Sequence, residues 1–521
     1  MSKTASALYA ELETSRNTYL QRARDCSVLT IPTLIPPAGH SNASNYETPF
    51  QGVGARGVNN IASKLLLALF PPNASFFRLV IDPYKLKKLG GGEELKVEME
   101  KALAEIENAV SKEIETSALR VPIFEALKHL IVAGNMLIYF PEKGGMRVFK
   151  LENYVVKRDP FGNVLNIVTK ECVSPSALPD EAKAMYKKHE KEEGEEYSND
   201  DSVDIYTCVH RKDNKWEVYQ EIEGEMVPES DGEYPIDKCP FIPLRYSRID
   251  GEDYGRGLVE EYLGDLRSLE ALTQAIVEGS ASASKVLFLV NPNGTTKIKS
   301  LAESKNGQFV SGNVADVNAL QLQKYGDFRV AKEVMVEIQT RLAFAFLLNS
   351  SVQRDAERVT AQEIRFMAQE LETALGGAYS ILSQEFQLPM VSRIMDRMSK
   401  ASRLPKLPKN DLIRPMIITG VEALGRGNDL TKLDLFLSGL AQIFGPEAMM
   451  QFVNIENYLK RRATALNIDT EGLVKTAEEI EQQKQQSMAL QLTNKLGPQT
   501  IKGISDVAGK TMQQQMQQTQ Q

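Results

Sequence analysis

Two amphipathic segments that flank a short insert place the strongest constraint on how this 521-residue chain folds. In both segments apolar residues recur every three or four positions, which is the spacing of one face of a helix. On the first helix these residues are Leu258, Tyr262, Leu266, Leu269, Leu272 and Ile276. On the second, over residues 328–346, they are Val330, Val334, Ile338 and Leu342. Since no neighbouring segment is an obvious partner for all of this apolar surface, packing of copies around a ring is one way to bury it.

A short charged loop and a sharply defined helix start follow the second segment. Thr360 and Glu363 form a capping box, in which the threonine side chain accepts a backbone hydrogen bond and the glutamate reaches back. Behind this cap an apolar stripe predicts one long helix as far as Pro389, with Gly376–Gly377 and Pro389 as places where it can bend. The stripe consists of Ile364, Met367, Leu371, Leu375, Tyr379, Leu382 and Phe386.

The rest of the chain predicts an α+β fold that is mainly helical. Helical periodicity covers residues 4–27, 51–69, 93–116 and 122–133, and residues 135–247 are rich in strand formers. Hairpin turns are expected at residues 159–163 and 212–215, and further short strands at 76–78, in the insert 281–327 and at 416–419. The acidic stretch 189–201 and the glutamine-rich end 476–521 have little to bury, which predicts mobility.

Charge, cysteine spacing and apolar runs argue against several classes of protein. The net charge of −8 is unlike the basic surface of a protein that wraps nucleic acid. The four cysteines lie far apart, without the close pairs typical of a zinc site. No apolar run is long enough to span a bilayer and the N-terminus lacks the apolar core of a signal peptide, so neither a membrane nor export is expected.

Two glycine-containing stretches resemble phosphate-binding loops but do not complete the pattern. Gly420 and Gly425 have the correct spacing, but Arg426 and Gly427 stand where a lysine and a hydroxyl residue are required. The GKT sequence at residues 509–511 lacks a preceding strand and a correctly spaced glycine. We therefore expect no ATP site, no cofactor and no enzymatic activity.

Four long blocks, in order along the chain, resemble the portal or head-to-tail connector proteins of short-tailed, podovirus-type bacteriophages. The blocks are YETPFQGVGARGVNNIASKLLLALFPP (46–72), FEALKHLIVAGNMLIY (124–139), GEDYGRGLVEEYLGDLRSLEAL (251–272) and RVTAQEIRFMAQELETALGGAYSILSQEFQLP (358–389). The resemblance implies a portal fold assembled as a ring, usually a dodecamer, at one capsid vertex. Its parts would be an N-terminal wing (1–254), a first stem helix (255–280), a clip (281–327), a second stem helix (328–348), a channel loop (349–359), a long wing helix with a return to the wing (360–446), and a crown with the glutamine-rich tail (447–521).

The resemblance also implies which residues face DNA and partner proteins. The channel loop would present Ser350, Ser351, Gln353, Arg354, Asp355, Glu357 and Arg358, anchored by Thr360 and Glu363. The clip would present Asn293, Gly294, Lys297 and Lys299 to the packaging motor and later to the tail. Two interpretations of Arg354 and Arg358 remain open: brief contacts with sliding DNA, or ion pairs with Glu357 and Asp355.

The implied partners are further copies of the chain, the terminase large subunit, tail adaptor and tail tube proteins, major capsid and scaffolding proteins, internal core proteins, and double-stranded DNA that passes without sequence specificity. An acidic ring suits such passage because it repels the DNA backbone. The implied location is the head–tail junction of the virion, after synthesis in the host cytoplasm. Alternatives are another ring or adaptor of that junction, or a DNA-packaging enzyme, which the incomplete phosphate loops disfavour.

Overall fold

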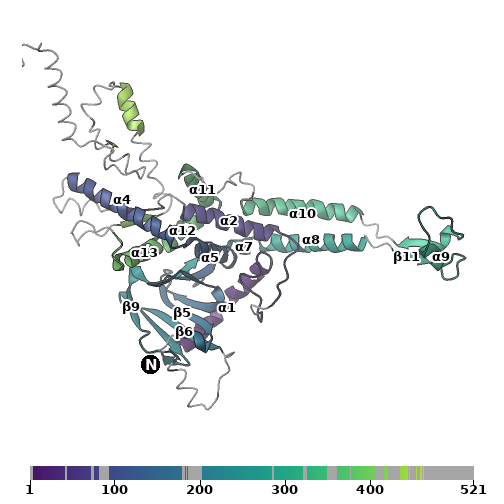
Figure 1. Cartoon of the computed structure of the whole chain (residues 1–521), viewed down its shortest axis with the longest axis horizontal. Helices are drawn as coiled ribbons and strands as arrows, with labels where there is room; N and C mark the ends of the chain where they lie inside the picture. Colours follow the sequence, from purple (N-terminus) through teal and green to yellow (C-terminus); the bar gives the residue numbers. More distant parts are fainter. Residues whose placement is uncertain are drawn as a thin grey trace, which may run out of the picture. The chain divides into compact units, whose positions relative to one another are not determined.

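Helices precede the sheets along the N-terminal part of the chain (Figure 1). The computed structural model describes residues 4–40, 44–71, 76–80, 93–178, 182–183, 185, 202–283, 287–320, 325–348, 361–375, 377–404, 416–419, 434–443, 445, 453, 458–459 and 462. The chain divides into two units, Met1–Leu424 and Gly425–Gln521, and nearly all of the described residues belong to the first. The two segments with predicted mobility, 189–201 and 476–521, lie outside the described residues.

Four N-terminal helices occupy the segments that the sequence predicts. They are α1 (Ala5–Val28), α2 (Val53–Leu69), α4 (Glu93–Thr116) and α5 (Arg120–Ala133). Thr4 caps α1, because its hydroxyl accepts a hydrogen bond from the backbone N–H of Ala7. The Glu221 carboxylate, from a strand more than 200 residues later, accepts from the N–H groups of Ala5 and Ser6. The start of α1 is therefore tied to the sheet as well as capped locally.

Two antiparallel sheets follow, as the strand-rich sequence predicts. The larger has the strand order β4-β5-β6-β7-β8, with β9 also paired to β7, and the smaller has the order β10-β2-β3. The strands are β2 (Asn135–Tyr139), β3 (Arg147–Phe149), β4 (Tyr154–Arg158), β5 (Val164–Val173), β6 (Val203–Lys212), β7 (Lys215–Ile222), β8 (Glu225–Met226), β9 (Gly232–Pro235) and β10 (Phe241–Arg245). Short helical turns are η1 (Leu151–Asn153), η2 (Pro175–Ala177) and η3 (Ile236–Lys238). Both predicted hairpins are confirmed, one closing between Asp159 and Asn163 and the other between Lys212 and Lys215.

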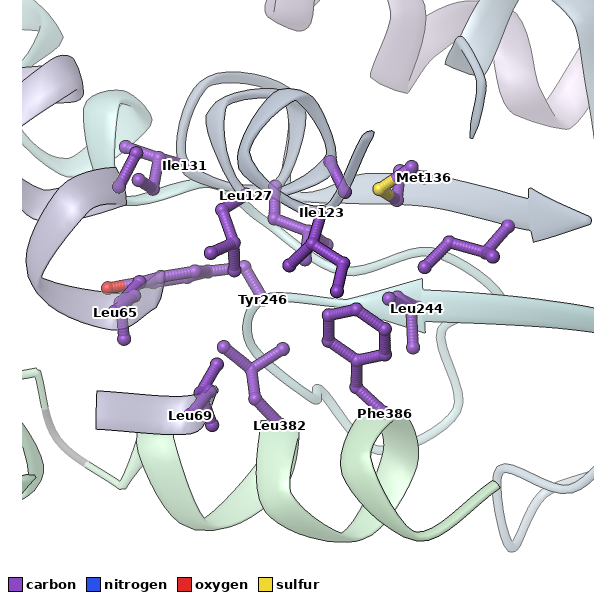
Figure 2. Packing of buried hydrophobic residues seen from close by; sticks show 14 of the residues in the cluster. Leu65, Leu69, Ile123, Leu127, Ile131, Met136, Leu244, Tyr246, Leu382 and Phe386 are labelled. Atoms are coloured by element: carbon purple, nitrogen blue, oxygen red, sulfur yellow. The ribbon is translucent and has the colours of Figure 1, made fainter. Parts of the chain in front are cut away.

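The main core surrounds α5. Figure 2 shows Leu127 of this helix beside Leu65 and Leu69 of α2, and beside Leu382 and Phe386 from the C-terminal helices α12 (Ala378–Leu382) and η6 (Ser383–Gln387). All five side chains are fully buried. Because burial of one such side chain contributes roughly 1.5–3 kcal/mol, this cluster joins segments far apart in the sequence into one body.

The apolar stripe behind residue 363 does not form one continuous helix, contrary to the prediction. The chain forms α11 (Ala361–Ala374), α12, the π-helical turn η6 and α13 (Leu388–Lys400). The first interruption lies at Gly377, whose φ of +86° is left-handed, at one of the places where the sequence allows a bend. The extra residue in the π turn then changes the helical phase of the residues that follow it. Leu371 and Tyr379 before this turn, Phe386 within it and Met390 after it are all buried in the main core.

The first amphipathic segment, for which the resemblance implies a stem helix over 255–280, is divided in two. The chain instead forms the one-turn helix α7 (Leu258–Glu261), a break at Tyr262, and then α8 (Leu263–Ala283). Gly257, directly before α7, is extended rather than helical, with φ −84° and ψ 156°, so the helical segment begins after it. It also approaches α5 closely, since a Cβ there would lie 2.7 Å from the carbonyl oxygen of Ile131.

The insert between α8 and α10 (Tyr325–Ala345) forms a small unit with its own strands. Its elements are β11 (Leu287–Val290), α9 (Ile298–Ala302), η4 (Val314–Asp316) and β12 (Val317–Leu320). β11 and β12 pair in antiparallel fashion, with Leu287 opposite Leu320. The sequence predicts these strands and turns but not the helix α9.

The chain returns to its N-terminal region through a predicted strand. β13 (Met416–Thr419) pairs with β1 (Phe77–Val80), and Thr419 stands opposite Phe77. Phe76 and Phe77 are buried, as expected for strand residues in a core. β13, which follows α13, is therefore paired with a strand whose Phe77 belongs to the main core.

Candidate functional site

The helices α8 and α10 lie side by side and run in opposite directions (Figure 1). Near one end, the guanidinium of Arg341 contacts Asp265 at 2.8 Å. Near the other, Gly279 leaves room for the ring of Phe328, since a Cβ on the glycine would lie 2.6 Å from a ring carbon. The pair, called here the α8–α10 hairpin, is thus fixed by contacts along its length.

The six apolar residues predicted to pack this region lie at different depths. Leu266 and Leu269 are fully buried, and Leu258 is nearly so. Tyr262 and Leu272 are half-buried and pack against the main core, and Ile276 is half-buried nearer the end of α8. Beyond Leu269, burial therefore decreases toward the end of α8.

The apolar face of α10 is not the one that the sequence predicts throughout. Ile338 and Leu342 are buried as expected, but Val330 and Val334 are 58% and 42% exposed. The residues that continue the packed face toward the start of α10 are Met335, half-buried against the core, and Phe328, which sits over Gly279. The valines fall on the adjacent side of the helix, and further exposed apolar side chains on α8 and α10 include Val277, Val336 and Phe344.

The end of α10 is held by polar side chains of α2. The Nδ2 group of Asn60 donates to the carbonyl oxygens of Phe346 and Leu347, each at 2.9 Å. The ammonium group of Lys64 donates to the same Leu347 oxygen at 3.2 Å. The ring of Phe346 lies directly over Gly57, where a Cβ would come within 2.4 Å. Carbonyl groups that a helix end leaves without partners are thus satisfied from another helix.

Lys64 also lies near α11, the helix that follows residues 349–360 in the sequence. Its side chain is only 5% exposed, and burial lowers its pKa, with the nearby Glu370 carboxylate of α11 offsetting part of that effect. Neither Asn60 nor Lys64 is among the predicted site residues. The apolar spacing of α2 holds a signal for Lys64, because this lysine occupies a buried position of an amphipathic helix, where a charged residue needs a specific partner. Asn60 is half-buried beside it.

The predicted channel-loop residues lie outside the described part of the chain. This applies to Ser350, Ser351, Gln353, Arg354, Asp355, Glu357, Arg358 and the anchor Thr360. Glu363 belongs to α11, but its side chain is also outside the described residues. The structure describes the helices that precede and follow this loop in the sequence, α10 and α11.

The insert folds around the carboxylate of Asp316. This carboxylate accepts hydrogen bonds from the backbone N–H groups of Thr295 and Thr296 at 2.9 and 3.1 Å, and from the Thr296 hydroxyl at 3.0 Å. The Thr296 bonds hold the pKa of Asp316 below its usual range. Gly294 is required at the turn, since a Cβ there would lie 2.4 Å from the Asp316 carboxyl carbon.

The predicted insert residues lie on this folded turn. Asn293, Lys297 and Lys299 are exposed, and Gly294 is half-buried. The same insert also exposes apolar side chains, which were not predicted. Leu289, Ile298, Phe309 and Val314 all project into solvent, and Phe309 is fully exposed.

The described ranges contain neither a metal-binding cluster nor a membrane-spanning helix. Within them, no group of three or more His, Cys, Asp or Glu side chains is placed to hold a metal ion. None of the described helices has the length and apolar character needed to cross a membrane.

Comparison with known proteins identifies the family. A sequence profile described as "Bacteriophage head to tail connecting protein" matches residues 2–474. The portal protein of Escherichia phage T7 is 45% identical over 494 residues, covering 94% of this chain and 90% of that protein. The portal proteins of Enterobacteria phages T3 and SP6 are 45% and 30% identical, covering 91% and 97% of this chain and 89% and 96% of their own lengths.

Among solved structures, a chain from the neck of an empty GTA particle covers 80% of this chain and 90% of its own length, at 10% identity and a TM-score of 0.36, too low to support an argument. The sequence relatives are structural portal proteins rather than enzymes, as the incomplete phosphate loops led us to expect. The profile match extends over most of the chain and the relatives cover nearly all of it. The chain belongs to the bacteriophage head-to-tail connecting protein family.

Proposed function

We propose that copies of this chain form the ring-shaped channel at one capsid vertex through which double-stranded DNA enters the head and later leaves it. The observation that carries the proposal is 45% identity to a portal protein over 94% of the chain. In this assignment the α8–α10 hairpin is the stem and residues 281–327 are the clip. The wing would comprise 1–254 and 360–446, and the crown and tail 447–521.

The exposed apolar residues of the hairpin support ring assembly. Val330 and Val334 are exposed beside the packed face of α10, and an apolar face of this kind is buried when a copy packs beside it. A ring places the same two surfaces in contact at every subunit boundary. Contacts of the hairpin, together with contacts of the wing, would hold the ring at the head–tail junction.

The channel and the clip would meet different partners. Residues 349–359 connect the stem to α11 and would face the DNA, with Arg354 and Arg358 either touching its backbone or pairing with Asp355 and Glu357. A net charge of −8 in each subunit favours passage over binding. The clip surface around Lys297 and Lys299 would dock the terminase large subunit and then the tail adaptor and tail tube proteins. Major capsid, scaffolding and internal core proteins would contact the wing and crown.

A packaging experiment tests this function. Heads assembled from capsid and scaffolding proteins with this chain should take up DNA when terminase and ATP are added, because the motor then has a vertex to dock on. Heads assembled without the chain should not. Equal DNA uptake in both preparations would contradict the proposal, and would leave an adaptor of the head–tail junction as the alternative.

A further inference from the structure

We propose that Asn60 and Lys64 of α2 are positioning residues that hold the end of α10 at a fixed place on α2, and so set where the chain leaves the folded body after residue 348. This inference rests on the proposed function, since it assigns the two residues a role in controlling DNA in the channel. It depends only on the three described helices, α2, α10 and α11.

The end of α10 has a strained form that an outside contact stabilises. Leu347 has φ +52°, a left-handed conformation usually taken by glycine. The N–H of Leu348 donates to the carbonyl oxygen of Ala343, and the N–H of Leu347 donates to that of Phe344. These two hydrogen bonds are the pair that defines a Schellman motif. The carbonyl oxygens of Phe346 and Leu347, which follow this ending, accept hydrogen bonds from Asn60, and that of Leu347 also accepts one from Lys64.

The same helix α2 is packed against the elements that follow residues 349–360. Met367 and Leu371 of α11 are buried in the core that contains α2. At the end of α2, the Tyr379 hydroxyl donates to the carbonyl oxygen of Ala68 at 3.3 Å, and the Gln387 amide donates to that of Leu69. One helix therefore contacts the chain on both sides of residues 349–360.

The choice of a lysine at this position indicates a role beyond stability. An almost completely buried ammonium group is costly to desolvate, and an apolar residue of similar volume is often at least as stabilising. The lysine adds a geometric requirement, because its N–H groups need an acceptor oxygen within hydrogen-bond distance, here that of Leu347. A buried polar contact of this kind specifies one position of the helix end where apolar packing would tolerate several.

The experiment compares assembled rings carrying Lys64→Met or Asn60→Leu with the parent. Hydrogen exchange at the amides of residues 346–348 should become about tenfold faster in Lys64→Met, since loss of a hydrogen bond to a charged group corresponds to about that factor in local opening. Asn60→Leu, which removes two neutral hydrogen bonds, should have a similar effect. Exchange within α8 should not change. Heads built from these rings should retain less packaged DNA, whereas Lys64→Arg, which keeps a cationic donor, should restore both properties. Ser63→Ala, an exposed neighbour on α2, is the matched control.

The outcomes separate this inference from the proposed function. If deletion of residues 353–357 leaves DNA packaging and retention normal, the proposed role of the channel loop fails. If that deletion is defective but Lys64→Met and Asn60→Leu show parental exchange or parental DNA retention, the positioning role is overturned. Should Lys64→Met fail to form rings, Asn60→Leu decides by the same two measurements.

Discussion

The core around α5 and the α8–α10 hairpin bury their apolar residues in different ways. In α5, Ile123, Leu127 and Ile131 are all fully buried within one chain (Figure 2). In α10, Leu342 is fully buried, but Val330 on the adjacent side is more than half exposed. The first region is complete in a single subunit, and the second has apolar surface left for another copy. Variants in the two regions should therefore separate folding from assembly.

The largest expected effect is on the stability of a subunit with a truncated core. Leu127→Ala removes a fully buried side chain at the centre of Figure 2 and should lower the free energy of unfolding by about 2–5 kcal/mol. Urea unfolding of the unassembled subunit measures this change. Val121→Ala, at a position of α5 that is 74% exposed, should change it by less than about 0.5 kcal/mol. Equal effects at both positions would refute the assignment of α5 to a self-contained core.

The next largest effect is a loss of folding stability at acid pH, which arises from a histidine in the same core. His129 is almost completely buried, and burial lowers its pKa to about 4. The unfolded chain binds a proton near pH 6.5 and the folded chain does not, so stability should be unaffected above that pH and fall as the pH drops toward 4. The full loss from this group would be about 3 kcal/mol.

A non-titrating residue should remove this acid dependence. Urea unfolding at pH 7, 6 and 5 should show a shallower decline for His129→Leu than for the parent chain, because leucine has no proton to bind. Parallel declines in the two proteins would mean that His129 takes up a proton in the folded state.

Substitutions in the α8–α10 hairpin should have the smallest effect on the stability of the subunit. Their effect on ring assembly should be large. Val330→Asp with Val334→Asp places charges on exposed positions and should change subunit stability by less than about 0.5 kcal/mol. In a ring the same charges would be buried without partners, which opposes assembly. Light scattering should then report subunits in place of rings, and Lys332→Ala on the same helix should still form rings. Normal rings from the double variant would place the subunit contact elsewhere.

Local sequence patterns predicted most of the elements. Periodicity located α1 and α4 almost to the residue, a short apolar run located β13, and turn residues located the hairpins at 159–163 and 212–215. These features depend on neighbours a few positions away, which a single sequence displays. The overall class, mixed with many helices, follows from the same patterns.

Contacts between distant segments were not predictable in this way. Gly257 lies against the end of α5, and the ring of Phe328 lies over Gly279, and neither contact between distant segments is visible in the local pattern. The link from Asn60 to the end of α10 spans 286 residues. Periodicity shows that a helix has an apolar face, but the partner helix determines which part of that face is covered.

Electron microscopy of the purified full-length chain tests the central claim most directly. End views should show a closed ring of about twelve subunits around an open channel, because the hairpin of each subunit presents an apolar side to its neighbour. Averaged images would give the subunit number and the channel width. Particles that are single subunits at concentrations where related rings assemble, or rings without a central channel, would contradict the account.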